Sequence, residues 1–184
     1  IENQCALIEL DNLGTDIIAL PETKVNWENP HEVNKWKNLI RRKWPKATIL
    51  TTSTPQGDWT TTPRPGGVCM AIRCKYASMV TASGKDDKGH CVWATITGAE
   101  RNTTVITCYR PCEDSVDMAG ESSQWMQLYN KHLQELGEQN APADEYTRVD
   151  PRDIMNKDLD SFITGEQEKG NSIILLGDTN QDLH

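Results

Sequence analysis

Hydrophobic and polar positions follow a helical period near the start of the chain and then change to an apolar run. Residues 6–13 carry apolar side chains at helical spacing, and Gly14 follows where a helix C-cap is expected. The apolar run 16–20 comes next and stops at Pro21, which predicts a short strand. A strand that is apolar on both faces is typical of a central position in a sheet covered by helices.

A second helix is predicted to begin at Asn29 and Pro30, an N-cap residue followed by a first-turn proline. Pro45 ends it. One stripe of this helix is apolar and consists of Val33, Trp36, Ile40 and Trp44.

The middle of the chain changes to short segments rich in Val, Ile, Thr, Cys and aromatic residues. These predict strands over residues 47–52, 67–73, 76–82, 90–97 and 103–109. Turn-like clusters separate them at residues 63–67, 83–89 and 98–102. Short strands with short connections predict an antiparallel meander.

Helical spacing returns over residues 125–136, and a further helix is predicted to open at Asp150-Pro151 and close near Gly165. A continuous apolar run at residues 172–176 predicts a last strand, and the polar stretch 138–147 predicts a loop. The alternation of helices and strands indicates an α/β domain built in layers.

Charge is distributed unevenly along the 184 residues. The net charge of −8 argues against a protein that coats nucleic acid by bulk electrostatics. Residues 1–85 nevertheless carry a net charge of +3, and residues 86–184 carry −11. The strongest basic cluster consists of Lys35, Lys37, Arg41, Arg42, Lys43 and Lys46. It is typical of a solvated helix face, with a phosphate-facing patch as the alternative.

Cysteine spacing and hydropathy bear on the compartment. The six cysteines include no C-x-x-C pair and the four histidines are scattered, which argues against a zinc site. No apolar run is long enough to span a bilayer, and the N-terminus has no secretory pattern, so we expect no membrane association. These features favour a reducing intracellular location, nuclear or cytoplasmic, rather than secretion. Because the chain begins with Ile1, we also expect it to be part of a longer protein.

Polar residues follow three of the predicted strands directly, at residues 20–23, 108–111 and 177–180. Hard carboxylate and amide oxygens suit Mg²⁺, which takes one or two protein carboxylates and keeps several waters. In Asp178-x-Asn180 a two-residue period would place both side chains on one face of an extended segment. Taken singly, a glutamate after a strand is more often a solvated loop residue, a tyrosine there is usually a half-buried aromatic, and a G-D-x-N segment is often an Asx turn.

Taken in order, four motifs are more specific: D-I-I-A-L-P-E-T-K at residues 16–24, G-G-V-C-M-A-I at 66–72, V-I-T-C-Y-R-P at 105–111 and I-I-L-L-G-D-T-N at 173–180. Together they resemble the endonuclease/exonuclease/phosphatase superfamily, whose members include DNase I-like and exonuclease III-like phosphodiesterases. Within it, the chain looks most like the endonuclease domains of non-LTR retrotransposons. The resemblance implies a four-layer α/β sandwich, two packed mixed sheets flanked by helices, with residues 1–184 forming one partial domain incomplete at both termini.

The same resemblance implies roles for individual residues. Glu22 matches the metal-binding glutamate, and Tyr109 matches a tyrosine that lies against the scissile phosphate. Asp178 matches the residue that orients or deprotonates the attacking water, and Asn180 matches one that bonds the phosphate or that water. The implied cofactor is Mg²⁺, or Mn²⁺ in its place.

The chain departs from the family pattern at Pro21, Thr179 and Cys112, where Gln, Phe and Asn are usual. It also lacks an initial strand with a metal-site Asn and a final Ser-Asp-His-like motif. We therefore expect the complete parent protein to be the active form, and this chain alone to be weakly active or inactive.

The implied function is Mg²⁺-dependent hydrolysis of phosphodiesters by activated water, with DNA as the substrate and a reverse-transcriptase region as a partner in the same polyprotein. Candidate DNA contacts are Arg64, Arg110 and the basic helix around Arg41. Two alternatives remain open. One is a degenerate, non-catalytic fragment or binding module, and the other is a family phosphatase or deadenylase acting on a lipid head group, nucleotide or RNA.

Overall fold

The computed structural model describes residues 10–54, 66–112, 123–139 and 150–180. Its first sheet has three strands, β1 (Ile17–Leu20), β2 (Thr48–Thr52) and β3 (Val68–Ile72). The strand order is β1-β3-β2, and both pairings are antiparallel.

The second sheet has four strands in the order β4-β5-β6-β7. They are β4 (Val80–Lys85), β5 (Cys91–Ile96), β6 (Thr103–Tyr109) and β7 (Ser172–Asp178). The first three form an antiparallel meander, whereas β7 pairs parallel with β6. The meander was predicted to include residues 47–52 and 67–73 as well, but these form β2 and β3 of the first sheet. A parallel pair requires a long crossover, and here that crossover contains two helices.

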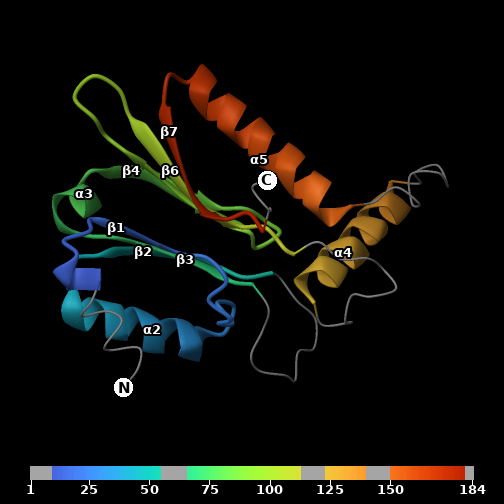
Figure 1. Cartoon of the computed structure of the whole chain (residues 1–184), viewed down its shortest axis with the longest axis horizontal. Coiled ribbons are helices and arrows are strands. Elements are labelled where there is room, and N and C mark those ends of the chain that lie inside the picture. Colours follow the sequence, from blue (N-terminus) through green and yellow to red (C-terminus); the bar gives the residue numbers. More distant parts are fainter. Residues whose placement is uncertain (1–9, 55–65, 113–122, 140–149, 181–184) are drawn as a thin grey trace.

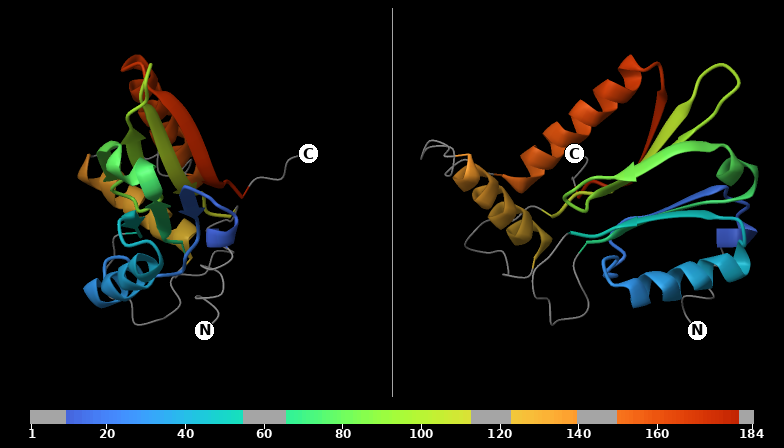
Figure 2. Two further views of the ribbon diagram at one scale, coloured as in Figure 1. Left: turned by 90° about the vertical axis from the view of Figure 1, so that its left-hand side faces the viewer. Right: turned by 180° about the vertical axis from the view of Figure 1, so that it is seen from behind.

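The two sheets stack face to face, and helices cover both outer sides (Figures 1 and 2). Helix α2 (Pro30–Lys43) packs on the first sheet, and α5 (Pro151–Glu168) lies along the second. Helix α4 (Gln124–Glu138) lies at one end of the stack. The predicted four-layer α/β sandwich is thus confirmed, with the difference that the first sheet is antiparallel throughout its described strands.

Strand β3 lies at the centre of the molecule and is buried at every position. Its side chains alternate between two cores because successive residues of a strand point to opposite faces. Cys69 and Ala71 pack with α2 residues such as Ile40, whereas Met70 and Ile72 pack between the sheets. Burial of both faces explains why the sequence of β3 is continuously apolar.

Helix α2 forms where its caps and its apolar stripe predict. The Asn29 side chain accepts a hydrogen bond of 2.9 Å from the backbone N–H of His31, and Pro30 occupies the first turn. Ile40 and Trp44 are buried against the first sheet, with Val33 and Trp36 packed beside them. The chain also turns near residue 14 as predicted, since Gly14 has a φ of +65° after a helical segment at residues 10–12.

Two strands predicted to be central or buried lie at sheet edges. Within the described residues β1 pairs only with β3, and β7 pairs only with β6. Ile174 and Leu175 of β7 are 45% and 43% exposed. Apolar runs reveal that a segment can be buried but not whether a neighbouring strand is present. The central position predicted for residues 16–20 is therefore wrong among the described strands, and the strand predicted at residues 172–176 is present but partly exposed.

Other boundaries differ from the sequence prediction because local patterns are ambiguous. The strand predicted at residues 76–82 is instead a short helix, α3 (Cys74–Ser78), followed by β4, which extends into the predicted turn. Helix α5 continues beyond Gly165 to Glu168. The predicted loop at residues 138–147 begins inside α4, and its part at 140–147 lies outside the described residues.

Near the C-terminal end of α5, a buried carboxylate ties the helix to the second sheet. Glu166 is 4% exposed and accepts hydrogen bonds from Thr104 at 2.7 Å, Asn171 at 2.8 Å and Lys169 at 2.7 Å. Thr104 also bonds the hydroxyl of Thr95 in the neighbouring strand. Hydrogen bonds from Lys169 and Thr104 lower the pKa of Glu166 below its usual value of 4.5.

We expect Glu166→Ala to lower the free energy of unfolding by about 2–3 kcal/mol, because it leaves the Thr104 hydroxyl and the Asn171 amide without their acceptor. Chemical denaturation at pH 7 measures this. The exposed neighbour Glu168→Ala is the matched control and should change stability by less than about 0.5 kcal/mol.

The lowered pKa adds a pH dependence with a definite sign. Ionised Glu166 stabilises the fold fully above the carboxyl's usual pKa of 4.5, and this contribution is lost as the pH falls through the lower value in the folded protein. Glu166→Gln should therefore weaken the loss of stability on acidification. An acid-unfolding curve identical to that of the unmodified protein would contradict this role.

Candidate functional site

The motifs that follow β6 and β7 lie side by side because the two strands are parallel and in register. Tyr109 pairs with Asp178 in the sheet, and the backbone N–H of Arg110 donates to the Asp178 carbonyl at 2.9 Å. The two motifs are about 70 residues apart in sequence and adjacent in space, as expected when parallel strands end at one edge.

Gly177 permits this close pairing. A Cβ atom at this position would lie 2.2 Å from the carbonyl oxygen of Cys108 and 2.9 Å from its Sγ. The close backbone approach predicted from the sequence is therefore present, and it is an approach of β6 to β7.

After Asp178 the chain turns rather than staying extended. The backbone N–H of Asn180 donates to the Asp178 carboxylate at 3.0 Å, and Asn180 has a φ of +44°. The Asn180 amide donates to the carbonyl of Arg110. The expectation that a two-residue strand period relates the two side chains is wrong, because an Asx turn relates them instead.

Glu22 is positioned by a loop that continues the pairing of β1 with β3. Thr23 and Lys24 donate backbone hydrogen bonds of 2.8 Å to the carbonyls of Gly67 and Gly66. Glu22 and Lys24 both have positive φ, +49° and +55°, a conformation that costs non-glycine residues about 1 kcal/mol or more. A Cβ at Gly67 would lie 2.8 Å from the Thr23 hydroxyl, so the missing side chain allows the loop to dock.

Tyr109 connects the Glu22 loop with the turn after β7. Its ring is buried between the sheets, 4% exposed, and burial raises the pKa of its hydroxyl, with further contributions from the negative charge of Glu22 and from Cys112. A hydrogen-bonding contribution from Asn180 lowers the same pKa but does not offset the rise. Glu22 and Asn180 thus both lie near Tyr109, and Asp178, which pairs with Tyr109 in the sheet, is exposed.

Arg152 also belongs to this region, although no pattern in the sequence indicated it. It lies in the first turn of α5, is 7% exposed, and its Nη2 donates to the Asn180 carbonyl at 3.1 Å. Asp150 caps this turn by accepting from the Arg152 backbone N–H at 2.8 Å, as Asp150-Pro151 predicted. The guanidinium thereby holds the turn that contains Asn180, a contact across 28 residues that no local pattern reveals.

Comparisons with known proteins identify the family. A profile of the Endonuclease/Exonuclease/phosphatase family matches residues 5–184. The chain belongs to this family. The match identifies the family as a whole and does not distinguish a retrotransposon endonuclease from its other members.

Several solved structures of the same general fold are similar to the chain. The human Nocturnin catalytic domain with bound sulfate anion has a TM-score of 0.53 at 14% identity, over 99% of this chain and 58% of that one. Humanized D. rerio TDP2 has a TM-score of 0.44 at 14% identity, over 97% of this chain and 55% of that one. This family member thus spans less than two thirds of either structure. No curated protein sequence matches it.

Members of the endonuclease/exonuclease/phosphatase family generally use divalent metal ions. Among the residues that the structure describes, no three His, Cys, Asp or Glu side chains lie close enough together to hold a metal ion. Glu22 offers one carboxylate, 37% exposed, with the Lys24 ammonium 3.6 Å away. A single hard oxygen ligand at an accessible edge fits Mg²⁺, which keeps most of its waters.

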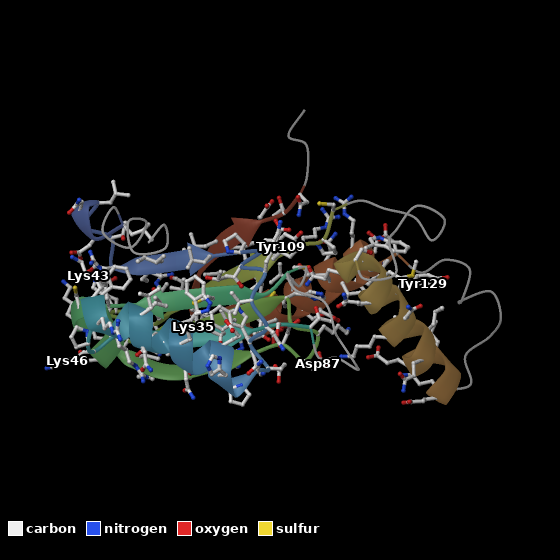
Figure 3. All side chains as sticks on the ribbon, turned by 90° about the horizontal axis from the view of Figure 1, so that it is seen from below. Lys35, Lys43, Lys46, Asp87, Tyr109 and Tyr129 are labelled. Carbon is white, nitrogen blue, oxygen red and sulfur yellow. The ribbon has the colours of Figure 1, made fainter. Side chains whose placement is uncertain are left out.

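The predicted nucleic-acid contacts are only partly visible in this family member. Arg64 lies outside the described residues, whereas Arg110 is at the site and its Nη1 lies 3.4 Å from the Thr179 carbonyl. On α2, Lys35 is 3.8 Å from Glu32 and Lys43 is 2.9 Å from Asp11, so both lysines have acidic partners (Figure 3). In the described parts of the chain, no helix is long and apolar enough to cross a membrane.

We expect Gly177→Ala to destabilise the protein by about 2–4 kcal/mol, because the added methyl group would overlap the Cys108 carbonyl and separate β6 from β7. Thermal and chemical unfolding measure the effect. Gly165→Ala is the control, since nothing lies within 4 Å of its Cβ position in α5, and it should stabilise the protein by about 0.5–1 kcal/mol. Equal effects of the two substitutions would contradict the close approach at Gly177.

Proposed function

We propose that this chain carries the hydrolytic site of a metal-dependent phosphodiesterase, and specifically of a retroelement DNA endonuclease. One observation supports this most strongly. Glu22 and Asn180 are more than 150 residues apart in sequence, yet both lie near enough to Tyr109 to change the pKa of its hydroxyl: Glu22 raises it and Asn180 lowers it.

Tyr109 would act as a hydrogen-bond donor to a phosphate oxygen. Its raised pKa keeps the hydroxyl protonated at neutral pH, and its buried ring fixes where the hydroxyl lies. A fixed donor aimed at developing negative charge stabilises a transition state more than it stabilises the ground state.

Asp178 and Asn180 would position the attacking water and the phosphate. The Asp178 carboxylate is exposed at the end of β7 and can accept a proton from water. The Asn180 amide donates to the Arg110 carbonyl, which fixes the amide plane, and a hydrogen bond from Asn180 also lowers the pKa of the neighbouring Tyr109 hydroxyl. Arg152 would stabilise this arrangement by donating a hydrogen bond to the backbone carbonyl of Asn180.

Glu22 would hold the divalent cation, Mg²⁺ or Mn²⁺. When bound, the cation neutralises negative charge on the phosphate and on the leaving oxygen. Glu22 adopts a left-handed backbone conformation, and its carboxylate is close enough to Tyr109 for its charge to raise the pKa of the tyrosine.

DNA as the substrate rests on the resemblance of the four strand-end motifs to retrotransposon endonucleases. The residues at the site recognise only the phosphodiester, which DNA shares with RNA, nucleotides and lipid head groups. A reverse-transcriptase region in the same polyprotein, and a nuclear or cytoplasmic location, belong to the same proposal.

Nicking of supercoiled plasmid in the presence of Mg²⁺ tests the proposal, both for the 184-residue chain and for the longest polypeptide that contains it. We expect weak nicking by the chain alone, and losses of about 10²–10³-fold in the longer polypeptide on Glu22→Gln, Asp178→Ala or Asn180→Ala. Glu100→Gln is the matched control, because Glu100 is exposed in the turn before β6, at the opposite end of that strand from Tyr109. Nicking unchanged by Glu22→Gln and Asp178→Ala would contradict the site. Hydrolysis of poly(A) or of a phosphorylated lipid head group in place of plasmid would contradict the choice of substrate.

A positioning role for Arg152 predicts a separate result. Arg152→Lys keeps the charge but shortens the contact with the Asn180 carbonyl, so kcat should fall by about tenfold with KM changed by less than about twofold. Steady-state kinetics at saturating Mg²⁺ measure the two parameters. Arg101→Lys, at an exposed position between β5 and β6, should change neither. A change in KM alone would show that Arg152 contributes to substrate binding instead.

A further inference from the structure

A cavity of about 130 Å³ lies between the second sheet and α5, apart from the candidate hydrolytic residues. Its walls are mainly apolar and come from β5, β6 and α5: Trp93, Ile106, Met155, Leu159 and Phe162. The rings of Trp93 and Phe162 lie 5.4 Å apart between centroids, at an angle of 40°. An apolar cavity of about 150 Å³ is large enough to hold benzene, so this volume suits a single aromatic ring.

One polar group in the wall of this cavity has no partner among the described residues. His90 is 2% exposed, and its Nε2 atom is buried without a hydrogen bond. Its Nδ1 atom lies 3.5 Å from the Asp86 carboxylate, which also accepts from the backbone N–H groups of His90 and Cys91 at 2.8 Å. A buried polar atom without a partner costs about 1–3 kcal/mol, so a ligand that supplies a hydrogen-bond donor would recover part of that cost.

The protonation of His90 decides what kind of ligand group it can accept. Burial lowers the pKa of the imidazole, against an opposing effect of the Asp86 charge, so the ring is neutral at pH 7. With its proton on Nδ1, facing Asp86, the ring presents Nε2 as an acceptor.

The charged residues at the cavity already have partners. Lys85 pairs with Glu28 at 3.1 Å, and Asp158 pairs with Lys88 at 2.6 Å. Asp86, the remaining charged residue of the wall, accepts from two backbone N–H groups and faces His90 Nδ1. Each charged group of the lining therefore already has a polar partner, and the aromatic walls favour a flat neutral ligand.

From these features we propose that the cavity binds a neutral monocyclic aromatic molecule that carries one O–H or N–H donor, with the ring packed against Trp93 and Phe162 in the wall and the donor on His90 Nε2. This site is independent of the proposed hydrolysis. One residue of its wall is nevertheless joined to the candidate site, because the backbone N–H of Tyr109 donates to the carbonyl of His90 at 3.0 Å.

Titration with phenol and with toluene tests the proposal, because the two probes have the same size and only phenol has a donor. NMR of the 184-residue chain would follow the methyl groups of Met155 and Ile106 and the Nε2 nitrogen of His90. We expect saturable methyl shifts with both probes, binding of phenol roughly fivefold tighter than that of toluene, and a His90 Nε2 shift with phenol alone.

Two variants locate the binding. Leu159→Trp should fill the cavity and abolish the methyl shifts, whereas Leu13→Trp, at a position 73% exposed, should bind phenol as the unmodified protein does. Absence of saturable methyl shifts, or phenol binding that survives Leu159→Trp, would overturn the site. Equal affinities for the two probes would overturn the donor requirement and place His90 Nε2 toward the neighbouring cavity of about 10 Å³. Should Leu159→Trp fail to fold, the comparison of the two probes on the unmodified protein still decides.

Discussion

The stacking of the two sheets is the constraint on which the candidate site depends. Strand β3 is buried on both faces and contributes to two cores. One face packs against α2 and the other packs against the second sheet, so β3 holds these layers together. Tyr109 belongs to the core between the sheets, yet it stands at the end of β6. Because the ring is held in that core, its hydroxyl is fixed at the edge where the Glu22 loop and the turn after β7 meet.

Backbone geometry at this edge depends on two glycines. Gly67 allows the loop that contains Glu22 to dock on the extension of β3, and Gly177 allows β7 to approach β6. Three non-glycine residues of the same edge, Glu22, Lys24 and Asn180, adopt left-handed backbone conformations. Such conformations persist only where surrounding contacts determine them, and they are concentrated in functional sites.

Several residues of the site combine structural and chemical roles. The side-chain amide of Asn180 donates to the Arg110 carbonyl, and its backbone carbonyl accepts from Arg152. A hydrogen bond from Asn180 also lowers the pKa of Tyr109. The turn at Asp178 and Asn180 is therefore both an Asx turn and a candidate catalytic element. The Asx turn that the sequence offered as an alternative is present, and the catalytic role stays a proposal with which this turn is compatible, because it orients the amide.

The sequence by itself determined the elements whose signals lie within one or two helical turns or within one strand. These include the caps Asn29 and Asp150, the apolar stripe of α2, the meander of β4, β5 and β6, and the polar motifs at the strand ends. The four motifs together also indicated the family to which the chain belongs. Only the tertiary structure decided that β1 and β7 are edge strands among the described residues, that α3 replaces part of a predicted strand, and that Arg152 supports Asn180. The physical reason is that periodicity and capping act between near neighbours in sequence, whereas strand order and long-range hydrogen bonds depend on which segments pack together.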